Sequence, residues 1–124
     1  MTSTITLTQR FAQALQDKWN AEGEANRTEY GSQWRYEVTV KEGRKFDRIF
    51  VASCLGNPQE PFVASGRYIH AFVERETGAV AKPAGVNKPA MWYGGTDLAT
   101  KYSLTTQFDE VLAVADKHGS YLYQ

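Results

Sequence analysis

The stretch WRYEVTVKEGRKFDRIFVASC, residues Trp34 to Cys54, decides the fold that we expect for this chain. In its first half apolar side chains alternate with polar ones, and a period of two indicates a half-buried β-strand. The apolar positions are Trp34, Tyr36, Val38 and Val40, and the polar ones are Arg35, Glu37, Thr39 and Lys41. Turn-forming residues follow at 41–44, and residues 45–54 are again rich in β-branched and aromatic side chains. The stretch therefore predicts a β-hairpin.

A second hairpin is expected on the C-terminal side of the first. Glycines and prolines break up residues 55–65 into a loop, and Arg67 to Glu74 has the composition of a third strand. The sequence ERETG then predicts a turn into a fourth strand that starts near Ala79, because Gly78 tolerates the positive φ of a bulged hairpin turn. Residues 82–96 contain two prolines and three glycines, which predicts a long ordered loop.

Helices are expected near both ends of the chain. Phe11, Leu15 and Trp19 are spaced four apart and so share one face of a helix, for which we predict Thr8 as the N-cap and Gly23 as the stop. A second apolar stripe predicts a helix that ends at Gly119, and its members are Phe108, Val111, Leu112 and Ala115. A short helical turn is expected from Asp97, and residues 120–124 are expected either to add an edge strand or to dock on the core.

The predicted fold is α+β: an antiparallel sheet of four to five strands, built from two hairpins, with an N-terminal and a C-terminal helix. The length of 124 residues predicts a single domain over 1–124. Fourteen basic residues balance fourteen acidic ones, so no overall field drives the protein onto nucleic acid or an anionic membrane. A lone cysteine and no apolar run of membrane-spanning length are typical of a protein of the reducing cytosol.

Catalytic and metal-binding patterns do not emerge from the sequence, so we predict that the protein is not an enzyme and has no metal or cofactor. Cys54 and His70 could in principle form a pair of nucleophile and base, but a lone cysteine at the end of an apolar strand is more often a small buried side chain. His70 and His118 lack ligand spacing, and the glycines match neither a phosphate-binding loop nor a dinucleotide fingerprint.

A binding site is predicted around the segment KPAGVNKPAMWY, residues 82–93, where cations suited to phosphate lie close to rings suited to stacking on bases. The predicted ligand-binding residues are His70, Arg75, Lys82, Asn87, Lys88, Trp92 and Tyr93. The alternative is that this segment has only a structural role, in which Trp92 and Tyr93 cover the core while Lys82 and Lys88 are solvated.

The third strand is apolar on both predicted faces. We expect Tyr68, His70 and Phe72 on one face, and Ile69, Ala71 and Val73 on the other. The second apolar face is explained by closure within the chain, by a subunit interface, or by a platform on which bases stack. The stacking platform is the third choice, because acidic residues lie among the nearby cations and reduce the positive charge that nucleic acid needs. The cations are Arg44, Lys45, Arg48, Arg67 and Arg75, and the acids are Glu42, Asp47, Glu74 and Glu76.

The stretch RYIHAFVERETGAVAKPAGVNKPA, residues 67–90, together with HGSYLY at 118–123, resembles a widespread group of small proteins of tailed bacteriophages and prophages. The likeness covers most of the chain from Trp34 onward and is most specific from His70 to Ala90. That group commonly has an aromatic residue where Ala81 stands and a tryptophan where Val86 stands. The resemblance implies a setting in an infected cell and no particular mechanism.

We therefore predict a non-enzymatic phage accessory protein that acts by binding in the cytoplasm of the host. Its predicted partners are a small nucleotide used as a defence signal, which it would sequester, or a host defence protein, which it would block. We also expect a homo-oligomer and no membrane association. The alternatives are a nucleic-acid-binding accessory protein and a minor component of the virion.

Overall fold

An antiparallel sheet of five strands, in the order β1-β2-β3-β4-β7, forms the body of the protein in a computed structural model. The structure describes residues 6–64, 66–85, 88–90, 100–116 and 119–122. The elements are α1 (Leu7–Ala25), β1 (Gln33–Lys41), β2 (Phe46–Gly56), β3 (Gly66–Glu74), β4 (Ala79–Ala81), β5 (Pro83–Gly85), β6 (Lys88–Pro89), β7 (Thr100–Ser103), α2 (Leu104–Val114) and the 3₁₀ turn η1 (Ser120–Leu122). The predicted α+β class, with an antiparallel sheet and a helix near each end, is confirmed.

Both predicted hairpins are present, and Gly78 takes the expected positive φ of 77° in the turn before β4. The sequence did not predict β7, which adds to the sheet beyond β4. The expected loop at 82–96 is partly wrong, because β5 and β6 pair as a small second sheet within it. The helical turn expected from Asp97 begins outside the described residues.

Helix α1 begins two residues earlier than predicted. Thr6 is its N-cap: the Thr6 hydroxyl accepts from the backbone N–H of Gln9, and the Gln9 side chain accepts from the N–H of Thr6. This reciprocal capping box satisfies two N–H groups of the first turn, which a cap at Thr8 would leave unpaired. The helix also continues past Gly23 to Ala25, so Gly23 is not its stop.

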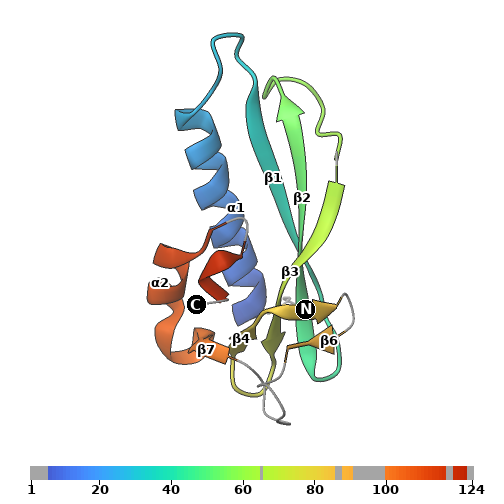
Figure 1. Cartoon of the computed structure of the whole chain (residues 1–124), viewed down its shortest axis with the longest axis vertical. Helices are drawn as coiled ribbons and strands as arrows, with labels where there is room; N and C mark the ends of the chain where they lie inside the picture. The colour runs from blue at the N-terminus through green and yellow to red at the C-terminus, as the bar shows by residue number, and fades with distance from the viewer. Residues whose placement is uncertain (1–5, 65, 86–87, 91–99, 117–118, 123–124) are drawn as a thin grey trace, which may run out of the picture.

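Helix α1 lies along β1, the edge strand of the sheet (Figure 1). Asn20 accepts from the Tyr36 N–H at 2.7 Å and donates to the Tyr36 carbonyl at 3.0 Å, while Gln16 accepts from the Val38 N–H at 3.0 Å. Four helical residues rise about 6 Å and two strand residues about 6.6 Å, so the two repeats stay in step. Side chains of α1 thereby occupy the open hydrogen-bonding edge of β1.

The predicted helix stripe forms the centre of the core, since Phe11, Leu15 and Trp19 are all fully buried. They pack against the inner face of the sheet, which includes Tyr36, Val38, Ile49, Val51, Ala71, Val73 and Val80. Trp34, on the same side of β1 near its start, is 44% exposed. The strand is therefore half-buried as predicted, except at this end.

Strand β3 contains a β-bulge that the sequence pattern does not reveal. Ile49 pairs with Ala71 and the next residue, Phe50, pairs with Ile69, so His70 is an extra residue in β3. The ring of His70 turns to the inner face, where its centroid lies 5.2 Å from that of Trp19. The prediction that Tyr68, His70 and Phe72 share one face is therefore wrong.

Helix α2 and the C-terminal turn lie on the same side of the sheet as α1 (Figure 1). Ser103 caps α2, and the helix ends at Val114, well before the predicted stop at Gly119. Lys18 donates to the carbonyls of residues 112, 113 and 115, and the Trp19 indole donates to the last of these. Tyr121 is buried, so the C-terminal turn docks on the core and adds no edge strand.

Replacing Gly23 by alanine should destabilise the protein by about 1–3 kcal/mol, although alanine is usually better than glycine in a helix. A Cβ atom at position 23 would meet the carbonyl oxygen of Trp34, so α1 would have to move away from β1. Urea unfolding of Gly23→Ala measures this. Gly66→Ala is the control, since nothing lies within 4 Å of its new Cβ, and a Gly23→Ala protein of wild-type stability would contradict the close approach.

Candidate functional site

The structure separates the predicted ligand-binding residues that it describes. His70 is 3% exposed and enclosed by α1 and the C-terminal turn, so it faces the core. Arg75 is bound at the tip of the first hairpin, where it donates to the Gly43 carbonyl at 2.7 Å. Lys82 is partly buried between β4 and β5, and Lys88 is exposed on β6. Asn87, Trp92 and Tyr93 lie outside the described residues.

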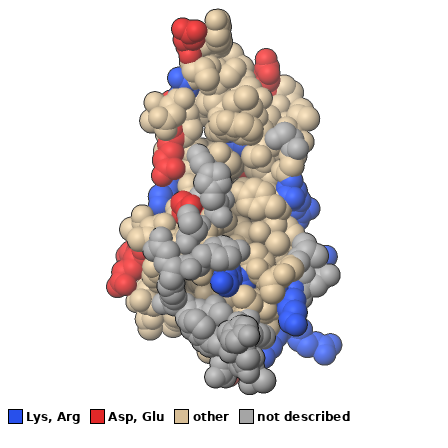
Figure 2. All heavy atoms as spheres, in the orientation of Figure 1, with Lys and Arg blue, Asp and Glu red and all other residues tan. Residues whose placement is uncertain are grey.

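Cations gather on the outer face of the sheet, the face of β1–β3 opposite α1. Strand register places Lys41 beside Arg48, and Arg67 beside Ala52. Arg35 lies further along β1, and Glu37 is the one acid in the row of alternate β1 residues Arg35, Glu37, Thr39 and Lys41. The molecule has no net charge, yet this face of its described strands is basic. Figure 2 shows basic side chains along the lower right, below and beside β3, and acidic ones mainly at the left and top.

Aromatic rings accompany the cations on the outer face. The Arg67 guanidinium lies 4.4 Å from the ring centroid of Phe50, and that of Arg48 lies 5.7 Å from the same ring. The Arg35 guanidinium lies 5.6 Å from the ring of Phe62, in the loop after β2. At these distances the guanidinium groups are attracted electrostatically to the faces of the rings.

An outer groove runs between this loop and the sheet. Its volume is about 710 Å³, which falls in the range of small-molecule sites. The outer groove combines two cations from opposite strands, an acid, a hydroxyl and a ring, and its lining residues are Glu37, Thr39, Val40, Lys41, Ala52, Phe62, Ala64 and Arg67. This set suits a ligand that is anionic at one end and flat at another.

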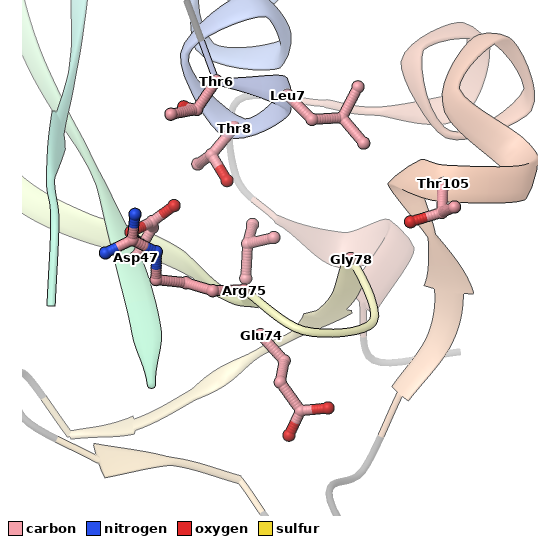
Figure 3. Close-up of a pocket in the computed structure, with 9 residues that line it drawn as sticks. Thr6, Leu7, Thr8, Asp47, Glu74, Arg75, Gly78 and Thr105 are labelled. Atoms are coloured by element: carbon pink, nitrogen blue, oxygen red, sulfur yellow. The ribbon is translucent and has the colours of Figure 1, made fainter. Parts of the chain in front are cut away.

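A second, smaller pocket lies on the helix side, at the first turn of α1 (Figure 3). It has a volume of about 170 Å³ and lies among α1, the ends of β2 and β3, and the start of α2. We call it the Asp47 pocket, and its lining residues are Thr6, Leu7, Thr8, Asp47, Val73, Glu74, Arg75, Gly78 and Thr105. Asp47 is 2% exposed, which is rare for a carboxylate.

A buried polar cluster joins the bulge in β3 to the C-terminal turn. His70 Nε2 lies 2.7 Å from the Tyr121 hydroxyl, and His70 Nδ1 has no hydrogen-bond partner among the described residues. Burial lowers the pKa of His70 from 6.5 to about 4, opposed by the charge of Asp116. Burial likewise raises the pKa of the Tyr121 hydroxyl. His70 is therefore a neutral core residue at neutral pH.

Sequence reasoning placed the site in the segment 82–93 and missed the outer groove. The sequence did indicate a basic face, because strict alternation puts Lys41 on the polar side of β1. The acidic residues nearby in the sequence were counted against this basic charge. The structure removes Asp47 from that balance by burying it on the inner face. Cys54 is buried, as predicted.

Comparison with protein families gives a match over the whole chain. All of residues 1–124 match a protein family described as a family of unknown function (DUF7717). No curated protein and no solved structure matches the chain. Among the described residues, no helix is both long and apolar enough to cross a membrane.

The unfolding free energy should fall as the pH drops from 6.5 to about 4, by up to roughly 3 kcal/mol. In this window the unfolded chain protonates His70 while the folded protein does not, so acid favours unfolding. Urea unfolding at a series of pH values measures this dependence of the unfolding free energy on pH. His70→Gln should be less stable at pH 7 but have a flatter pH profile, whereas Tyr121→Phe keeps a buried imidazole and should keep the slope. Equal slopes in wild type and His70→Gln would contradict the assignment.

Proposed function

The chain thus belongs to a family of unknown function, and from its geometry we propose that it acts by binding a nucleotide in the outer groove. The observation that carries this proposal is the meeting of Lys41, Arg67 and Phe62 in one groove of about 710 Å³. Cations hold phosphate, and flat rings and guanidinium planes stack on bases. This differs in location from the site predicted at residues 82–93, and it keeps the predicted class of ligand.

Each part of a nucleotide has a counterpart in the outer groove. Lys41 and Arg67 enter from β1 and β3, and both side chains are exposed, so they can reach a phosphate without being freed from a buried ion pair. Phe62 offers a ring to the base. Glu37 and Thr39, on the groove floor, can accept from or donate to ribose hydroxyls and base edges.

Local charge supports this ligand class more strongly than the overall charge does. A protein of zero net charge attracts polyanions only through a patch, and the outer face of β1–β3 has one. Because both groove cations are exposed, binding of a small anion here should weaken as the salt concentration rises. A small anion can therefore bind here although the molecule as a whole is neutral.

The resemblance to phage proteins supports the cytoplasm of an infected bacterium as the setting. In that setting the protein would sequester a nucleotide that serves as a defence signal, without chemical conversion of it. Self-association is part of this proposal. It is supported by exposed apolar side chains at one end of the sheet, where Trp34 pairs with Leu55 and both are about half exposed.

Removing either groove cation should weaken nucleotide binding by roughly tenfold or more, since each would lose a charge-assisted contact with phosphate. The test is calorimetric titration of Lys41→Ala and Arg67→Ala with a panel of mononucleotides and cyclic dinucleotides. Arg44→Ala is the matched control, because Arg44 is exposed on the adjoining turn and does not line the groove. Equal losses in all three variants would indicate a diffuse charge effect, and no binding by the wild type would refute the proposal.

A single-stranded nucleic acid is the second candidate, because the cations of the outer face continue beyond the groove to Arg35 and Arg48. A strand that contacts several phosphates should bind with an affinity that falls steeply with salt, by about 0.7 logarithmic unit per unit of log salt for each phosphate. Affinity for oligonucleotides of increasing length, measured at several salt concentrations, distinguishes the two. A shallow salt slope and no gain beyond a dinucleotide would exclude the strand.

A further inference from the structure

Asp47 is a buried carboxylate whose hydrogen-bonding capacity is not filled by the described residues. It is 2% exposed, and its Oδ1 atom has no hydrogen-bond partner among them. Arg75 Nε lies 3.6 Å from Oδ1, which is an ion pair beyond hydrogen-bonding distance. The Nη1 atom of Arg75 donates instead to the Gly43 carbonyl at 2.7 Å. A buried carboxylate left in this state is costly, which points to a missing donor.

The Asp47 pocket is where such a donor would lie. Figure 3 shows Asp47 at one end of the pocket, Thr8 on α1 above it and Thr105 on α2 at the other side. The Thr105 hydroxyl donates to the Thr77 carbonyl, so its own oxygen can still accept. Glu74 lines the mouth and its side chain points away from the pocket (Figure 3). Apart from Arg75, the polar side chains that remain in the lining are the carboxylate of Asp47 and the hydroxyls of Thr6, Thr8 and Thr105, all of which can accept a hydrogen bond.

We propose that the Asp47 pocket binds a primary alkylammonium group. The three N–H bonds of such a group match the carboxylate of Asp47 and the hydroxyl oxygens of Thr8 and Thr105, and bonds between an ammonium and a carboxylate are about twice as strong as neutral ones. Leu7 and Val73 give the pocket apolar wall for an alkyl stem. The volume of about 170 Å³ holds a chain of a few carbons and excludes a nucleotide.

The charge of Asp47 decides against an anion at this helix N-terminus. Helix N-termini favour anions, but here a buried carboxylate already lies at the first turn of α1 and would repel a second one. Arg75 is the other cation at this carboxylate, and its 41% exposed side chain is held by the Gly43 carbonyl through Nη1, so a bound ammonium would share Asp47 with it. The Asp47 pocket opens on the helix side of the sheet, so it is independent of the outer groove and of the function proposed for that groove.

The test uses n-butylammonium chloride with the full-length protein, followed by amide chemical shifts and melting temperature. Binding should shift the amides of Leu7, Thr8 and Thr105, leave those of the outer groove unchanged, and raise the melting temperature with concentration. n-Butanol has the same stem without the charge and should bind more weakly by roughly tenfold. Equal binding of butanol, or no shift with butylammonium, would overturn the proposal and leave a pocket that holds water alone.

Asp47→Asn should reduce the affinity for butylammonium by roughly 10- to 100-fold, whereas Asp109→Asn, an exposed carboxylate on α2, should not change it. If Asp47→Asn does not fold, Thr8→Val serves as the second variant, because valine has nearly the same shape as threonine. Thr8→Val should weaken the binding of butylammonium severalfold. Wild-type affinity in either folded pocket variant would overturn the proposal. Nucleotide titrations of the same variants should be unaffected, so failure here is distinct from failure of the groove.

Discussion

The docking of α1 on the open edge of β1 is the contact on which the rest of the structure depends. An edge strand presents unpaired N–H and C=O groups, which invite other chains unless they are covered. Asn20 and Gln16 fill them with side-chain amides, and Gly23 allows the helix to approach the next carbonyl. Because these polar contacts fix the height and rotation of α1, its apolar stripe lies over the inner face. The same helix then reaches α2, whose last carbonyls accept from Lys18 and Trp19.

The bulge at His70 decides what each face of the sheet can do. Without the extra residue, strand alternation would place the side chains of His70 and Ala71 on opposite faces of the sheet. His70 would then lie on the outer face. With it, the imidazole enters the core beside Trp19 and Tyr121, while Phe72 stays on the outer side near Phe46. Phe72 is 2% exposed within the chain, so no partner is needed to explain this apolar residue on the outer face.

Charge is sorted between the two faces of the sheet. On β2, Asp47 faces the inner side and Arg48 the outer side, so one residue of register separates a buried carboxylate from an exposed basic surface. The inner carboxylate lies near the first turn of α1, which attracts negative charge. The outer cations Arg48 and Arg67 lie against the ring of Phe50, and Arg67 also lines the groove. A chain with no net charge thereby acquires one acidic and one basic site.

The sequence by itself determined the α+β class, both hairpins, the turn at Gly78 and the apolar stripe of α1, because these follow from local periodicity and turn chemistry. The sequence also contains the pattern of the capping box, with Gln9 three residues after Thr6, although the predicted N-cap was Thr8. Only the tertiary structure decided the bulge at His70, the addition of β7 and the burial of Asp47. The two candidate sites belong to this second group: Lys41, Phe62 and Arg67, or Thr8, Asp47 and Thr105, are far apart in sequence and meet only when separate elements pack together. Local pattern contains no information on such meetings, because long-range register and packing create them.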